Sequence, residues 1–129
     1  MKLKVLLSIA AVYLGLIGIG MIFVPRYFGV GAVPADASSE LLAFLRIFGG
    51  PCLGIAVLNW LTRNAAPSET RNAVVLANMI GFTSVALSDV FDVSTGGARP
   101  AAKLFLVIHL SLAIAFIVAW RGSSARRAA

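Results

Sequence analysis

Apolar residues fill four long stretches of the chain, and polar residues gather in the short segments between them. Each stretch has about the ~20 residues that a helix needs to cross a bilayer. The pattern predicts membrane-spanning helices at about 5–24, 41–61, 72–91 and 101–120. Short connections make neighbouring helices antiparallel. The predicted fold class is therefore all-α, a single integral membrane domain over residues 1–129 that forms an up-down-up-down four-helix bundle.

Residue types at the ends of the stretches support these boundaries. Pro25 should end the first helix, because proline cannot continue the backbone hydrogen-bond ladder. The segment 36–40 offers capping oxygens and an acid for the start of the second helix. Ser68 is the expected N-cap of the third helix, with Glu69 as an acidic residue in its first turn.

Composition agrees with a membrane protein. The chain is 60% hydrophobic and only 12% charged, whereas soluble domains have roughly half apolar and a quarter charged residues. The basic start up to Lys4 is typical of a signal peptide, but the apolar run continues to Val24 with no small-residue cleavage site, so we expect a retained helix. The net charge of +6 comes from helix ends and tails, which favours lipid headgroups over nucleic acid as the partner.

The distribution of basic residues predicts the orientation. Seven lie in the termini and the second loop, and three lie in the first and third loops and the adjoining helix ends. The positive-inside rule then places both termini in the cytoplasm. Trp60 and Trp120 fall at the cytoplasmic ends of their helices, where interfacial aromatic residues are expected.

Three of the apolar stretches carry an ionisable residue, namely Arg46, Asp89 and His109. Such groups are costly in hydrocarbon and usually face the bundle interior. With a rise of 1.5 Å per residue, Arg46 should lie roughly 8 Å and His109 roughly 12 Å below the outer ends of their helices, and Asp89 about one turn inside. The three side chains are therefore predicted to share an outward-opening polar pocket.

Helical spacing extends this prediction along the third helix. Asn78, Phe82, Val85, Asp89 and Asp92 recur at intervals of three and four residues, which predicts one inward-facing stripe. Asp92 lies close to water at the helix end.

Small residues on the second helix are expected to let a neighbouring helix approach closely. Arg46 shares its face with Gly49 and Gly50, and Gly50 with Gly54 forms a small-xxx-small pair suited to packing in lipid. Pro51 should kink this helix, either beside a cavity or as simple curvature.

Each ionisable residue has alternative roles. Arg46 and Asp89 either form a structural ion pair with each other or contact the headgroup of a ligand or an anion. His109 is either a neutral packing histidine bonded to a carbonyl or serine, or a proton carrier, ligand contact or metal ligand. A single histidine and a single cysteine, Cys52, do not make a recognisable metal-ligand set, so neither metal nor cofactor is predicted.

Motifs of soluble enzymes are absent from the sequence. The run Arg46-Ile47-Phe48-Gly49-Gly50 with Gly54, in a four-helix chain whose first helix ends in Pro-Arg, resembles bacterial membrane proteins grouped with the DoxX-like superfamily. The resemblance implies a small inner-membrane protein without an agreed activity. Some DoxX-like members are associated with quinol or thiosulfate oxidation, or act as partners of other membrane proteins.

The functional hypothesis is a non-enzymatic membrane protein that binds a small amphipathic or lipid-like molecule, or serves as an accessory subunit. Its expected partners are the bilayer, that molecule, and a second copy or a membrane partner protein. One alternative is a membrane enzyme that transfers protons on a quinone, sterol or lipid substrate. A second is a purely structural bundle. The predicted ligand-binding residues are Arg46, Asp89, His109, Asn78 and Asp92.

Overall fold

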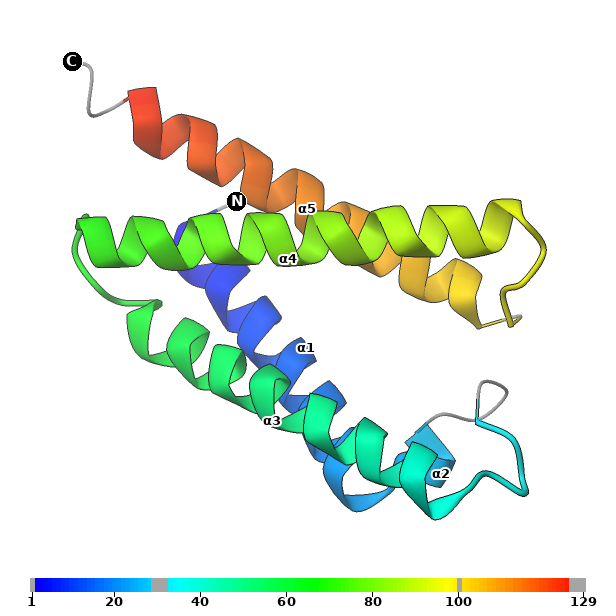
Figure 1. Cartoon of the computed structure of the whole chain (residues 1–129). Helices are drawn as coiled ribbons and strands as arrows, with labels where there is room; N and C mark the ends of the chain where they lie inside the picture. The colour runs from blue at the N-terminus through cyan, green and yellow to red at the C-terminus, as the bar shows by residue number, and fades with distance from the viewer. Residues whose placement is uncertain (1, 29–32, 100, 126–129) are drawn as a thin grey trace. The chain divides into compact units, whose positions relative to one another are not determined.

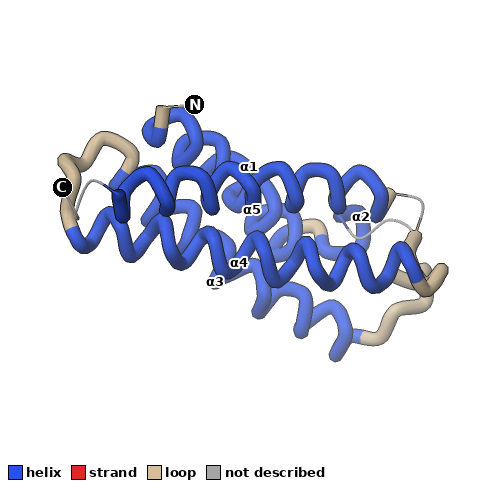
Figure 2. Tube along the Cα trace, turned by 90° about the horizontal axis from the view of Figure 1, so that it is seen from above, coloured by secondary structure: helices blue, strands red, loops and turns tan. Residues whose placement is uncertain are grey.

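The computed structural model describes residues 2–28, 33–99 and 101–125. Helices joined by loops account for this described part of the chain, which contains no strand (Figure 2). The all-α prediction is confirmed. The helices, drawn in Figure 1, are α1 (Leu3–Phe23), α2 (Pro25–Phe28), α3 (Ser39–Thr62), α4 (Glu69–Ser94) and α5 (Ala102–Ala125).

The four long helices correspond to the four predicted spans. Each is long and apolar enough to cross a membrane, by length and composition. Their ends differ from the predicted ends by up to five residues, the largest difference being at the C-terminal end of α5.

Serine side chains cap the N-terminal ends of two of these helices, α3 and α4. The Ser38 hydroxyl accepts a hydrogen bond from the backbone N–H of Leu41 at 3.2 Å, and the Ser68 hydroxyl accepts one from Arg71 at 3.2 Å. Each bond satisfies one of the backbone donors that a helix leaves free in its first turn. The predicted N-cap at Ser68 is confirmed.

The short helix α2 was not predicted. Val24 interrupts the helical structure, and a new helical turn begins at Pro25. Proline is well suited to a first helical position, because its missing N–H would have no partner there. The aromatic ring of Phe28 then lies against Gly20 of α1, where a Cβ atom would come within 2.3 Å of the ring.

The side chain of Arg26 in α2 forms hydrogen bonds to the segment before α3, a contact that we call the Arg26 clip. The guanidinium of Arg26 donates to the carbonyl oxygens of Ala35 at 2.7 Å and Ala37 at 3.4 Å. The segment that enters α3 is therefore tied to α2 through one arginine.

Contacts divide the chain into two units, one over Leu7–Arg63 and the other over Asn64–Ala129 together with Met1–Leu6. We describe each unit by itself, as the α1–α3 pair and the α4–α5 hairpin. The arrangement of all four helices as one up-down-up-down bundle stays a prediction.

Glycines make the closest approach in the α1–α3 pair. A Cβ atom at Gly18 would lie 2.8 Å from the carbonyl oxygen of Gly49, and a Cβ atom at Gly49 would lie 2.8 Å from that of Gly18. Farther along, Gly15 faces Ala56. Residue numbers thus rise on one helix as they fall on the other, so α1 and α3 are antiparallel.

The predicted packing pair of Gly50 and Gly54 is wrong within this unit. A Cβ atom at either position would meet nothing within 4 Å. The neighbouring glycine, Gly49, makes the close contact instead, because it lies about 100° farther round the helix. The helix itself runs unbroken through Pro51.

Candidate functional site

One face of α4 carries the buried residues of the α4–α5 hairpin. The buried positions follow each other at steps of three and four residues, as expected for one helix face, and they are Asn72, Val75, Asn78, Phe82 and Ala86. Asp89 continues this row, and its side chain is only 18% exposed. The carboxylate therefore lies at the end of a mostly apolar stripe.

The facing stripe of α5 has the same character. Phe116 is fully buried, and Leu112 and Ala113 beside it are 7% and 3% exposed. The ring of Phe116 stacks on Phe82 with 5.7 Å between centroids and 9° between planes. His109, two turns nearer the start of α5, is 13% exposed.

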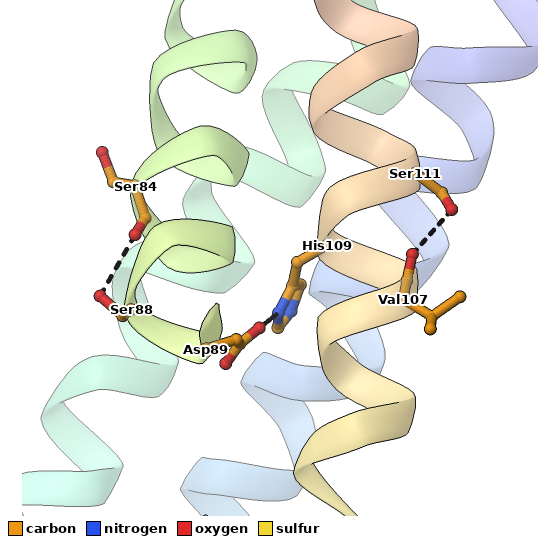
Figure 3. A network of polar contacts seen from close by, with 6 residues as sticks. All are labelled: Ser84, Ser88, Asp89, Val107, His109 and Ser111. Carbon is orange, nitrogen blue, oxygen red and sulfur yellow. Dashed lines mark hydrogen bonds and ion pairs between the residues drawn. The ribbon is translucent and has the colours of Figure 1, made fainter. Parts of the chain in front are cut away.

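Asp89 and His109 bond to each other across the hairpin. Nδ1 of His109 lies 2.6 Å from Oδ2 of Asp89 (Figure 3). When the carboxylate is ionised it can only accept, and the imidazole then donates through its Nδ1–H. A bond of this length with a charged acceptor belongs to the strong class of hydrogen bonds. It fixes the orientation of the histidine ring, as a carboxylate does in many sites that use imidazole.

Aromatic rings flank the histidine along the same face. The Phe105 ring lies 6.1 Å from the imidazole with 25° between planes, and the Phe82 ring lies 6.3 Å away with 34°. The guanidinium of Arg99 is 5.2 Å from the centre of the Phe105 ring. The polar pair is thus set among rings, with one cation near the hairpin loop.

The hairpin geometry explains why these two residues meet. Asp89 lies ten residues before Arg99 and His109 ten residues after it, and Phe82 and Phe116 each lie seventeen residues from it. In an antiparallel pair folded about a loop near Arg99, such positions reach the same height. Asp89 is five residues from the end of α4, about 7.5 Å along the axis, so the pair lies near the loop end of the hairpin.

Nearby hydroxyls take no part in the pair. Ser88 donates to the carbonyl oxygen of Ser84 at 3.2 Å, and Ser111 donates to that of Val107 at 2.7 Å. Figure 3 shows both bonds on the outer sides of their own helices, away from the Asp89–His109 bond. Each hydroxyl donates to a carbonyl oxygen of its own helix. Ser88 and Ser111 are therefore suitable control positions for substitutions of Asp89 and His109.

Two other predicted site residues are not part of this cluster. Asn78 is buried and donates to the carbonyl oxygen of Val74 at 2.8 Å, and it lies eleven residues from Asp89, about 16 Å along α4. Asp92 is exposed. Within the hairpin, Asn78, Phe82 and Asp89 of the predicted stripe lie on the covered face, whereas Asp92 and Val85, which is 43% exposed, do not.

Arg46 belongs to the α1–α3 pair. It is exposed, and within this unit it forms no hydrogen bond or ion pair with another described residue. Because the two units are described separately, the predicted Arg46–Asp89 contact and the shared pocket stay predictions. His109 bonds to a carboxylate rather than to the carbonyl or serine that was expected of a packing histidine.

Asp89 and His109 supply two ligand atoms, fewer than the three or four protein ligands of zinc sites. The arrangement can donate or accept a hydrogen bond and can hold a proton within apolar surroundings.

A comparison with known proteins gives one family. The model of the family described as "Domain of unknown function (DUF8292)" matches residues 8–127. No curated protein and no solved structure matches the chain. Since the match covers nearly the whole chain, this protein belongs to the DUF8292 family.

Proposed function

We propose that the chain is an integral membrane protein of a bacterial inner membrane, with four spans and both termini in the cytoplasm. Large apolar side chains at the surface support insertion, such as Leu16, Ile47 and Leu87, which are 65%, 69% and 66% exposed. The excess of basic residues in the termini and the second loop supports the orientation. A reporter fused to the C-terminus should be active only in the cytoplasm, and a periplasmic signal would reverse the topology.

We infer that the α4–α5 hairpin holds a binding site for a small amphipathic or lipid-like molecule, with Asp89 and His109 at its polar end. The observation that carries this proposal is the 2.6 Å bond between two ionisable, largely covered side chains on apolar helices. Ionisable groups at membrane depth are costly, and they commonly mark ligand or proton sites.

The surroundings of the pair favour a ligand with two chemically different ends. The imidazole and carboxylate suit a head group that forms hydrogen bonds. The rings of Phe82 and Phe105 and the apolar surface of the helices suit a hydrocarbon or ring system. The DoxX-like resemblance and a role as an accessory subunit are compatible with this site and stay predictions.

The proposal is tested by identifying small molecules that copurify with the protein. His109→Ala and Asp89→Asn should each lose a molecule that wild-type protein retains in gentle detergent, as measured by mass spectrometry. Ser111→Ala and Ser88→Ala change hydroxyls on the same two helices but outside the pair, so they should retain it. If His109→Ala accumulates normally and keeps every molecule seen with wild type, the binding site is disproved.

A second candidate function is proton transfer on a quinone, sterol or lipid substrate. The orientation of the imidazole by a carboxylate favours it, because a general base is usually held in this way. Reconstituted protein would then accelerate the exchange of an ionisable hydrogen of the substrate with deuterated solvent, and His109→Ala would abolish this exchange while Ser111→Ala would not.

A purely structural pair is the remaining alternative. It predicts that Asp89→Asn lowers thermal stability and leaves both the copurifying molecules and any turnover unchanged. Stability and ligand content therefore have to be measured on the same preparations.

A further inference from the structure

The exposed face of α3 carries one cation among apolar side chains. Arg46 is exposed and has neither a hydrogen-bond nor an ion-pair partner among the described residues of the α1–α3 pair. On the same side of α3, within about 100° of Arg46 around the helix axis, Ile47, Val57 and Leu61 are 69%, 55% and 69% exposed. A guanidinium on an apolar helix surface favours binding of an anion whose remaining parts are apolar.

The register of the α1–α3 pair gives the height of Arg46. The facing residues Gly18 and Gly49 have numbers that sum to 67, and those of Gly15 and Ala56 sum to 71. In antiparallel helices, residues at the same level keep about the same sum of their numbers. Arg46 therefore lies level with residues 21 to 25, where α1 ends at Phe23. Helical side chains lean toward the helix N-terminus, so the guanidinium extends from α3 past the end of α1, to the level of α2.

Aromatic residues mark this level as a membrane boundary. Phe23 and Tyr27 are 73% and 79% exposed, and tyrosine is enriched where hydrocarbon meets headgroups. At the opposite end of α3, the guanidinium of Arg63 lies 3.6 Å from the centre of the Trp60 ring. Arg46 and Arg63 are seventeen residues apart, about 26 Å along the helix, which approaches the ~30 Å hydrocarbon thickness of a bilayer.

We propose that Arg46 binds the phosphate of an anionic phospholipid whose acyl chains lie along the apolar side of α3 formed by Ile47, Val57 and Leu61. The planar guanidinium can hold two phosphate oxygens at once. An anionic lipid is favoured over a zwitterionic one, because the amine of a zwitterionic headgroup competes for the same phosphate. This inference requires membrane insertion but not the ligand site at Asp89 and His109.

The test is a titration of full-length protein in detergent with dioleoyl-phosphatidylglycerol, followed by native mass spectrometry. Arg46→Gln should weaken binding of this lipid about tenfold, the loss expected for a charge-assisted hydrogen bond. Arg46→Lys keeps the charge and should retain part of the affinity. Lys103→Ala removes an equal charge from an exposed position on α5 and should leave the affinity unchanged.

Three results would overturn the proposal. The first is equal affinity of wild type and Arg46→Gln for phosphatidylglycerol. The second is displacement of the lipid by millimolar inorganic phosphate, which would indicate a site for the free anion. The third is a strong stability coupling between Arg46→Gln and Asp89→Asn, which would assign the guanidinium to Asp89.

If Arg46→Gln fails to accumulate, wild-type protein decides the question. Phosphatidylglycerol should then bind more tightly than dioleoyl-phosphatidylcholine, and equal affinities would reject the site. A failure of the Asp89–His109 ligand site would leave all these results unchanged, so the two proposals can fail separately.

Discussion

The α1–α3 pair and the α4–α5 hairpin are both antiparallel, but they pack by different means. In the first, Gly18 and Gly49 bring two backbones together, and the side chains of Leu53 and Ile22 pack directly against these glycines. In the second, aromatic rings and one carboxylate–imidazole bond fill the space between the helices. Small residues allow close van der Waals packing in lipid, whereas the ionisable pair adds chemistry that packing does not require. A glycine contact therefore characterises one unit, and a contact between ionisable side chains characterises the other.

The largest expected effect is the loss of the ring that fills the hairpin. Phe116 is fully buried and stacks on Phe82, so Phe116→Ala should lower the free energy of unfolding by about 3 kcal/mol through the cavity it leaves. Chemical unfolding in mixed micelles measures this change. Phe91→Ala removes a ring that is 66% exposed and should cost less than about 1 kcal/mol. Equal losses would mean that the stacked rings do not hold the hairpin together.

A smaller effect is expected from adding a methyl group to the α1–α3 pair. The new Cβ of Gly49→Ala would lie 2.8 Å from the backbone oxygen of Gly18, so the helices must separate at a cost of about 2 kcal/mol. Gly50→Ala places the same methyl group where nothing lies within 4 Å. It should leave stability unchanged or raise it by up to about 1 kcal/mol through helix propensity. A loss at Gly50 as large as that at Gly49 would place a further close contact on the Gly50 face.

The smallest of these effects is the coupling between Asp89 and His109. A double-mutant cycle with Asp89→Asn and His109→Ala should give a coupling energy of about 1 kcal/mol, as is common for polar links between membrane helices. The parallel cycle with Ser88→Ala and His109→Ala should be additive, because Ser88 bonds within its own helix. Additivity in both cycles would leave hydrophobic packing as the link between α4 and α5.

Patterns of single helices could be predicted well from the sequence. Uninterrupted apolar runs located the four long helices, and the hydroxyl of Ser68 located the start of α4. Helix α2 was missed because Pro25 was interpreted only as the end of a helix, although the same residue favours the start of the next one.

Contacts between helices were harder to predict. The predicted inward-facing stripe of α4 continues from Phe82 to Val85, whereas in the structure the buried residue after Phe82 is Ala86. Steps of three and four are both compatible with one helix face, and only the position of α5 selects between them. The same holds for Gly49 and Gly50 on α3, since adjacent residues differ only in which one meets the neighbouring helix.

The Asp89–His109 bond could have been predicted from the sequence with one further step. Both residues lie ten positions from Arg99, and a tight hairpin brings equidistant positions to one level. The predicted partner of Asp89 was Arg46, chosen by charge and by estimated depth. Proximity along a hairpin is a more direct geometric constraint than depth across a bundle.

The Arg26 clip has a consequence for where the first connection can lie. A loop normally needs water to satisfy its backbone carbonyls, and each one left without a partner in a poorly hydrated layer costs roughly 1–3 kcal/mol. Arg26 supplies donors to the carbonyls of Ala35 and Ala37 from within the protein. These two carbonyl oxygens therefore depend less on water, and if the chain is inserted in a membrane as proposed, this segment is suited to the poorly hydrated layer of lipid headgroups.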